Sequence, residues 1–187
     1  MPEKTIKSQR IFQGRLLQLD VLEVDLGGRR TGRREIVRHP GAVAVWLVAP
    51  DGRLVLVRQY RKALERHLLE VVAGTREPGE SARACAIREV REETGYTVAA
   101  VTALGRIYTA PGFCNEAIDI YYARAAAAPA ASRPDFDEKI AVRHVTMAQF
   151  AGMVARGTVR DAKTLAAWSL AQTRMQPQTG AVKGRPS

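Results

Sequence analysis

The stretch that decides the fold is residues 74–96, "GTREPGESARACAIREVREETGY". Its apolar spacing predicts a helix over 81–94, on which Glu89, Glu92 and Glu93 share an arc of roughly 100°. Carboxylates three or four positions apart repel by about 0.2–0.5 kcal/mol per pair. A divalent cation would reverse this repulsion, because Mg²⁺ is held by one or two carboxylates plus substrate phosphates. The pattern therefore favours a metal-binding helix over a solvated acidic face.

The same stretch predicts both ends of this helix and its buried side. We expect it to begin at Ser81 and to stop at Gly95, a residue suited to the left-handed position after a helix. Ala84, Ile87 and Val90 are predicted to face the core.

Apolar runs predict strands on both sides of the helix. Residues 1–40 are expected to form strands, because Leu17, Leu19, Val21 and Val24 alternate with polar residues within 15–26 and Gly27-Gly28 signals a turn. Two apolar runs within 41–60 are joined by Pro50-Asp51-Gly52, which predicts a hairpin. Further strands are expected over 67–74, 96–104, 118–125 and 140–145.

Capping residues predict two more helices, over about 147–156 after Thr146 and over 162–174 after Asp161. Residues 125–134 are expected to form a surface loop. The whole divides into a β extension over 1–40, an α/β domain over 41–174 and a disordered tail over 175–187.

Composition limits the classes of function. The 187 residues carry a net charge of +10 but no run of five basic residues, so a nucleic-acid partner is not expected and a phosphorylated small molecule fits. No run approaches the roughly 18 apolar residues that span a bilayer. The first ten residues lack a signal-peptide core, so we expect a cytoplasmic protein without a membrane partner. Cys85 and Cys114 are expected to be reduced.

The acidic stretch matches a longer pattern, G-x5-E-x7-R-E-U-x-E-E-x-G-U, where U is a bulky apolar residue. The matching residues are Gly74, Glu80, Arg88, Glu89, Val90, Glu92, Glu93 and Gly95. This resembles the signature of the Nudix hydrolase family at every fixed position. Tyr96, at the last U, is a mild departure because that residue is usually aliphatic in the family.

The resemblance implies an α/β/α sandwich around a mixed sheet. It also implies hydrolysis of a nucleoside diphosphate linked to another group, with Mg²⁺ or Mn²⁺ bound. The implied metal ligands are Glu89, Glu93, the backbone carbonyl of Ala73 and Glu92, the last as a ligand or as a catalytic helper. Arg88 is expected to orient the glutamates, while Glu80 is either structural or a distal ligand.

Residues outside this pattern resemble the ADP-ribose pyrophosphatase subgroup. Pro111 follows Tyr96 by fifteen positions, as in that subgroup, and Glu116 follows in turn. Arg61 matches a position that contacts substrate phosphate or ribose, and Arg34 is a weaker candidate of the same kind. Pro111 and Glu116 would then belong to the wall of the substrate pocket.

The subgroup usually takes its catalytic base from a loop before a late strand. Here that loop contains "DFDEKIAV", and Glu138 is the predicted base, ahead of Asp137 and Asp135. Glu92 remains an alternative base.

The N-terminal strands resemble the extension through which members of this subgroup dimerise. We therefore expect a homodimer, in which Phe12 and Arg29 or Arg30 are candidates for reaching the partner's adenine site.

The leading hypothesis is a hydrolase that converts ADP-ribose and water to AMP and ribose 5-phosphate. A GDP- or UDP-hexose is the alternative substrate. An ADP-ribose-sensing regulator is a more remote alternative, because the fifteen residues after 172 are too few for a DNA-binding domain. A hydrolase of RNA caps or 5′-triphosphates is supported only by the basic net charge.

Overall fold

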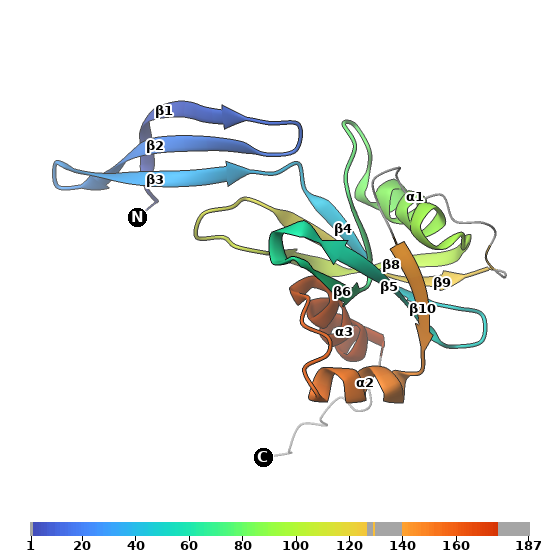
Figure 1. The fold of residues 1–187 in the computed structure, drawn as a ribbon. Coiled ribbons are helices and arrows are strands. Elements are labelled where there is room, and N and C mark those ends of the chain that lie inside the picture. Colours follow the sequence, from blue (N-terminus) through green and yellow to red (C-terminus); the bar gives the residue numbers. More distant parts are fainter. Residues whose placement is uncertain (1, 127–128, 130–139, 176–187) are drawn as a thin grey trace, which may run out of the picture.

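The computed structural model describes residues 2–126, 129 and 140–175. Within these ranges the chain forms a small antiparallel sheet followed by a larger mixed sheet with helices on both faces (Figure 1). The expected loop over 125–134 and the expected tail over 175–187 lie largely outside the described residues.

The small sheet consists of β1 (Lys4–Gln13), β2 (Gln18–Gly27) and β3 (Arg30–Arg38), paired in that order. It projects away from the main sheet (Figure 1). The prediction of strands was right, but the alternation did not give the buried face. Leu17 is 40% exposed, whereas Asp20 is buried between Arg10 and Arg38.

The predicted hairpin forms at the centre of the main sheet. The chain turns between β4 (Ala42–Val48) and β5 (Leu54–Arg61), where the Ala49 amide donates to the Arg53 carbonyl at 2.8 Å. The two strands pair directly only at Leu47–Val48 and Leu54–Val55 and then diverge. This divergence leaves room for two further strands.

The run over 67–74, predicted as one strand, is in fact two. β6 (Arg66–Glu70) pairs with β5, and β7 (Val72–Thr75) pairs with β4, so together they fill the space between the diverging strands. The break lies at Val71, whose amide donates to the hydroxyl of Thr164 at 2.9 Å instead of continuing the ladder.

The remaining strands complete a seven-stranded sheet. β8 (Val98–Tyr108), β9 (Ala117–Ala125) and β10 (Ile140–Val145) give the order β10-β5-β4-β9-β8. β4 and β9 are parallel and the other pairs are antiparallel. The expected mixed sheet is therefore confirmed.

Helices cover both faces of this sheet (Figure 1). α1 (Ala82–Thr94) lies on one face, and α2 (Met147–Ala155) and α3 (Ala162–Met175) lie on the other. Alternate residues of β4 serve the two layers: Val43 and Val45 pack with the α1 side, while Ala44 and Trp46 pack with the α2–α3 side. The expected α/β/α sandwich is confirmed.

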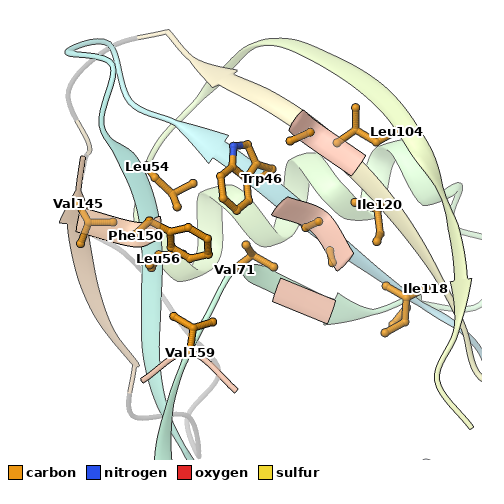
Figure 2. Close-up of a cluster of buried hydrophobic side chains, with 14 residues drawn as sticks. Trp46, Leu54, Leu56, Val71, Leu104, Ile118, Ile120, Val145, Phe150 and Val159 are labelled. Atoms are coloured by element: carbon orange, nitrogen blue, oxygen red, sulfur yellow. The ribbon is translucent and has the colours of Figure 1, made fainter. Parts of the chain in front are cut away.

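Aromatic packing fixes the second layer. Trp46 meets the edge of Phe150 at a centroid distance of 5.1 Å, and Phe150 meets Trp168 at 5.7 Å. Figure 2 shows Trp46 and Phe150 side by side among buried aliphatic residues. Edge-to-face pairs of this kind add about 0.5–1.5 kcal/mol beyond burial of area. They anchor α2, on which Phe150 lies, against the sheet.

The predicted caps of the helices are present. The Ser81 hydroxyl accepts from the Ala84 amide at 3.1 Å, and Gly95 ends α1 with φ +73°. Thr146 forms a capping box with Gln149, and the Asp161 carboxylate accepts from the Thr164 amide at 2.9 Å. None of the helices in the described part of the chain is long and apolar enough to cross a bilayer.

The core face of α1 differs from the predicted one. Ala84 is exposed, and the buried residues are Cys85, Ala86, Val90, Glu93 and Thr94. The reason is the path of the helix over the sheet, which turns Cys85 toward the backbone of β7. This rotation also brings Glu93 to the edge of the core. Both cysteines are free, as expected.

Candidate active site

A pocket of about 950 Å³ lies where β4 and β5 diverge. Its walls come from both helical layers and from the strands between them. The lining side chains that carry charge are Arg15, Arg61, Arg76, Glu77, Arg88, Glu89, Glu92, Glu93 and Lys163. The pocket therefore joins acidic residues of α1 to cations contributed by other elements.

The acidic wall is graded in burial along α1. Glu93 is 3% exposed, and the side chains of Glu89 and Glu92 are 12% and 40% exposed. Ala73 and Gly74 of β7 line the pocket beside them. The predicted metal ligands are thus gathered on one wall.

Arg88 organises this wall. Its Nη1 donates to Glu89 Oε1 at 2.8 Å and to Glu92 Oε2 at 2.9 Å. Its Nε and Nη2 donate to the two oxygens of Glu80, each at 2.9 Å. The hydrogen bond to Glu80, with smaller contributions from Glu92 and Glu89, raises the pKa of Arg88. Arg88 thus contacts two of the three glutamates that it is predicted to orient, and the orienting role stays a prediction.

Glu80 connects the loop before α1 to the helix. Besides Arg88, its carboxylate accepts from the Glu77 amide at 3.1 Å. The hydrogen bond from Arg88 holds the pKa of Glu80 at about 2, against the opposing effect of burial. Of the two roles left open by the sequence, the structure favours the structural one, because both oxygens are bound and Glu80 does not line the pocket.

Gly74 makes room for Glu89. A Cβ at position 74 would lie 1.8 Å from Glu89 Oε1, far inside any permitted contact. The absent side chain lets the carboxylate rest directly against the backbone of β7. Beneath it, burial raises the pKa of the Cys85 thiol to about 12, so this side chain acts as an inert filler.

The acidic wall suits a divalent cation in the chemistry of its donors. Carboxylate and carbonyl oxygens are the ligands that Mg²⁺ and Mn²⁺ prefer. Within residues 2–126, 129 and 140–175, no three acid, histidine or cysteine side chains already surround one point, and Arg88 holds Glu89 and Glu92. Ala73, Glu89, Glu92 and Glu93 would hold the ion.

A second wall, formed by Arg61 and Lys163, centres on a buried carboxylate. Glu70, at the end of β6, is 1% exposed and receives Arg61 Nε at 2.8 Å and Arg61 Nη2 at 2.7 Å. Lys163 Nζ, from the first turn of α3, donates to the same carboxylate and to Asp161 at 3.0 Å. Burial acts to raise the pKa of Glu70, but Arg61 and Lys163 outweigh it and hold that pKa below its usual value.

Comparison with known proteins identifies the family. The NUDIX domain model matches residues 37–168, which include α1, the strands of the larger sheet and the pocket lining except Arg15 and Leu16. The chain belongs to the Nudix family.

Three curated relatives cover most of this Nudix chain. An ADP-ribose pyrophosphatase of Bacillus subtilis (strain 168) is 41% identical over 88% of this chain and 89% of its own length. A protein named methanol dehydrogenase activator, from Bacillus methanolicus, is 40% identical over 88% of this chain and 90% of its own. A GDP-mannose pyrophosphatase of Cronobacter sakazakii (strain ATCC BAA-894) is 31% identical over 86% and 87%.

A solved structure shares the Nudix fold. The crystal structure titled as an ADP compounds hydrolase superposes with a TM-score of 0.82 at 22% identity and covers 96% of this chain and 97% of its own. At this level of identity the match supports the fold, including the N-terminal strands within the shared region.

Three predicted substrate residues lie away from the Nudix pocket within one chain. Arg34, on β3, pairs with Glu3. Pro111 lies in the loop after β8, and Glu116 accepts from Thr109 Oγ1 at 2.7 Å. None of the three lines the pocket, so their substrate roles stay predictions.

The loop that contains Pro111 is tied to the end of β3. The Val37 amide donates to the Phe113 carbonyl at 2.7 Å, and the His39 amide donates to Asn115 Oδ1 at 2.8 Å. The predicted base Glu138 and its alternatives Asp137 and Asp135 lie outside the described residues.

Several pocket residues were not predicted from the sequence. They are Arg15, Gln59, Arg76, Glu77 and Lys163, with Glu70 behind the wall. The sequence predicts that the stretch 161–164 mainly starts a helix. Asp161 does cap α3, but Lys163 also reaches the pocket. A lysine in the first turn of a helix gives no signal in a single sequence that would separate these roles.

Proposed function

We propose that this Nudix protein hydrolyses the diphosphate bond of ADP-ribose to give AMP and ribose 5-phosphate, with Mg²⁺ or Mn²⁺ bound. The observation that carries the proposal is one pocket lined both by carboxylates of α1 and by the cations Arg61 of β5 and Lys163 of α3. The relative at 41% identity, named ADP-ribose pyrophosphatase, supports the choice of substrate.

A divalent cation at Glu89, Glu93 and the Ala73 carbonyl would neutralise phosphate charge and lower the pKa of water. The chain itself holds the carboxylates in place through Arg88 and leaves space for Glu89 at Gly74. Arg61 is fixed by Glu70 with further N–H groups available for phosphate oxygens. Positioning and charge stabilisation account for most of the catalysis expected of phosphoryl chemistry.

A general base completes the proposed site. Glu138 is proposed to take the proton of the attacking water, with Asp137 or Glu92 as the alternatives. Pro111 and Glu116 are proposed to shape the ribose end of the substrate site. Arg34 would contribute only if a second chain brought it near. A cytoplasmic location stays a prediction of the sequence.

A panel of nucleotide sugars tests the substrate. Purified protein with Mg²⁺ is given ADP-ribose, GDP-mannose, UDP-glucose and a 5′-capped RNA, and the products are separated by chromatography. AMP from ADP-ribose is expected at the highest kcat/KM. Faster release of GMP from GDP-mannose would make GDP-mannose the substrate in place of ADP-ribose. If the protein hydrolyses none of the nucleotide sugars, the proposed function is overturned.

GDP-mannose is the second candidate because a relative 31% identical over most of the chain is named a pyrophosphatase for it. The two substrates share the diphosphate and differ in base and sugar. The Arg61 and α1 walls would serve either of them. The panel separates the two candidates by comparing kcat/KM for ADP-ribose with kcat/KM for GDP-mannose.

We also propose a homodimer formed through the small sheet. Every residue of β1 is exposed, and Ile6, Ile11 and Phe12 are each more than half exposed. Exposed apolar side chains in such number mark an interaction surface. Light scattering after gel filtration is expected to give twice the chain mass. Ile11→Glu is expected to shift the protein to monomer, and an unchanged mass would place the interface elsewhere.

A further inference from the structure

Arg76 lines the pocket but differs from the cations of the two walls, which are each paired with carboxylates. It donates from Nε and Nη2 to the backbone carbonyl of Glu80, at 3.3 Å and 2.8 Å. Across the ranges that the structure describes, it forms no ion pair. The guanidinium is thus held in place by the chain while its charge remains available to a ligand.

Arg76 lies beyond the carboxylates of the α1 wall rather than among them. Glu89 rests against Gly74, and Arg76 follows Gly74 by two residues, about 7 Å of extended chain. From there its side chain reaches Glu80, which precedes α1, while its amide donates to the Gly41 carbonyl at 3.2 Å. This offset from Glu89 favours a group attached beyond the diphosphate over the diphosphate itself.

Two more arginines lie near Arg76, around the ring of Tyr121 on β9. Burial raises the pKa of Tyr121 and Asp119 adds to this rise, while three arginines oppose it. The three are Arg76, Arg106 and Arg83. Arg106 is paired with Asp119 through hydrogen bonds of 2.8 Å and 3.0 Å, whereas Arg83, in the first turn of α1, has no ion pair among the described residues. The groups around Tyr121 thus carry more positive than negative charge.

The surroundings of Arg76 suit a phosphate. The side chain is half-buried, and removing a guanidinium from water is costly unless an anion or hydrogen-bond acceptors replace the water. Glu80 supplies one acceptor, and Nη1 makes no hydrogen bond within the described part of the chain. Phosphate matches the planar fork of arginine, and a fork that is already oriented loses less entropy on binding.

We propose that Arg76 binds a phosphate group attached beyond the hydrolysed diphosphate, so that the protein prefers a phosphorylated ADP-ribose to ADP-ribose itself. Arg83 and Arg106 add positive potential at this subsite. The inference rests on the proposed function and deepens it, because it narrows the substrate to nucleoside diphosphate sugars with a third phosphate. Either ribose of ADP-ribose can carry that phosphate, and the test distinguishes the two.

Relative rates on three substrates test the subsite. Wild-type protein with Mg²⁺ is given ADP-ribose, 2′-phospho-ADP-ribose and ADP-ribose 1″-phosphate, and kcat/KM is measured for each. One phosphorylated form is expected to exceed ADP-ribose by about tenfold or more, the size of a charge-assisted hydrogen bond. Its identity shows which ribose carries the phosphate. If wild type hydrolyses neither phosphorylated form faster than ADP-ribose, the inference is overturned.

Arg76→Met tests whether this arginine is responsible for the preference. It is expected to lower kcat/KM about tenfold more for the preferred phosphorylated form than for ADP-ribose. The ratio is measured within one variant, so a partial loss of folded protein cancels, and thermal unfolding monitors the fold. Arg58→Met is the matched control, because Arg58 is an exposed arginine of β5 that does not line the pocket, and its ratio should equal that of wild type. An equal loss on both substrates in Arg76→Met would assign Arg76 to the diphosphate and overturn the inference.

Equilibrium binding separates this inference from the proposed function. The same three ligands are titrated calorimetrically in calcium, and chromatography confirms that each stays intact. The preferred phosphorylated form is expected to bind wild type about tenfold or more tighter than ADP-ribose, and Arg76→Met is expected to abolish the difference. If wild type hydrolyses no nucleotide sugar, the proposed function fails while this titration still decides the inference. If ADP-ribose is hydrolysed and the three ligands bind equally, only the inference fails.

Discussion

The two walls of the pocket are built as electrostatic opposites. On the α1 wall a single cation, Arg88, holds the carboxylates of Glu80, Glu89 and Glu92. On the second wall a single buried carboxylate, Glu70, holds two cations. In each case the residue at the centre has the charge opposite to that of the side chains that it binds.

One fold can thus line a cavity with both signs of charge. A shared counter-charge lets like charges lie close together, because an uncompensated buried charge is costly. The α1 wall keeps an excess of carboxylates that a cation can neutralise, whereas the Glu70 network is neutral and orients its cations outward. One wall suits metal, and the other suits phosphate.

The largest effect is expected on the α1 wall. Glu93→Gln keeps the shape of the side chain and removes a charge from a proposed metal ligand. We expect kcat/KM for ADP-ribose to fall roughly a thousandfold, the size of a lost electrostatic contact at a reacting centre. Steady-state assays with Mg²⁺ measure it, and Glu65→Gln, at a 72% exposed side chain, serves as the control. Activity of Glu93→Gln within tenfold of wild type would remove Glu93 from the metal site.

A backbone change should disturb the same wall without altering any charge. Gly74→Ala would place its Cβ 1.8 Å from Glu89 Oε1, so the carboxylate must move. Displacement of about 1 Å costs on the order of a hundredfold in rate. Gly152→Ala is the control, because its Cβ would approach only the flexible end of Arg156 at 3.0 Å. Equal activity in the two variants would show that the position of Glu89 does not matter.

The dependence of stability on pH tests the ion pair between Glu80 and Arg88. The pKa of Glu80 is lowered from 4.5 to about 2 in the folded chain, mainly by Arg88. Its stabilisation is therefore fully present above pH 4.5 and is lost as the pH falls toward 2. Glu80→Gln is expected to lower the free energy of unfolding by about 1–3 kcal/mol at pH 7 and to flatten this acid slope. Urea titrations at a series of pH values test it, and an unchanged slope would contradict it.

The smallest effect is expected for an ion pair outside both walls. Arg34 and Glu3 are 39% and 41% exposed, and surface pairs of this kind contribute about 0–1 kcal/mol. Arg34→Met should therefore leave kcat/KM within about twofold of wild type, as for other surface substitutions. A tenfold loss would instead indicate that a partner chain brings Arg34 to the pocket. Repeating the assay with monomeric Ile11→Glu separates these outcomes.

The sequence predicted local features well where one segment was sufficient. The spacing of Glu89, Glu92 and Glu93 fixed them on one arc, and Ser81 and Gly95 marked the ends of their helix. The Pro50-Asp51-Gly52 turn and the caps at Thr146 and Asp161 were also right, because turn and cap chemistry is local. The resemblance to the Nudix family supplied the sandwich.

Features that depend on packing between segments were less predictable. The break at Val71 follows from a hydrogen bond to Thr164, which is 93 residues away. The prediction that Ala84 faces the core was wrong, because apolar periodicity shows that a helix has an apolar side but not how the helix is rotated against the sheet. Asp20 is buried because β1 and β3 bring Arg10 and Arg38 to it.

By itself the sequence determined the chemistry of one wall, because the carboxylates of a single helix are neighbours in the chain as well as in space. The resemblance singled out Arg61 on the other wall, but only the tertiary structure joined it to Glu70 and Lys163, since the three come from a strand, its neighbour and a helix on the opposite face from α1. Their meeting depends on the divergence of β4 from β5 and on the docking of α3, which are long-range packing outcomes that no short pattern encodes.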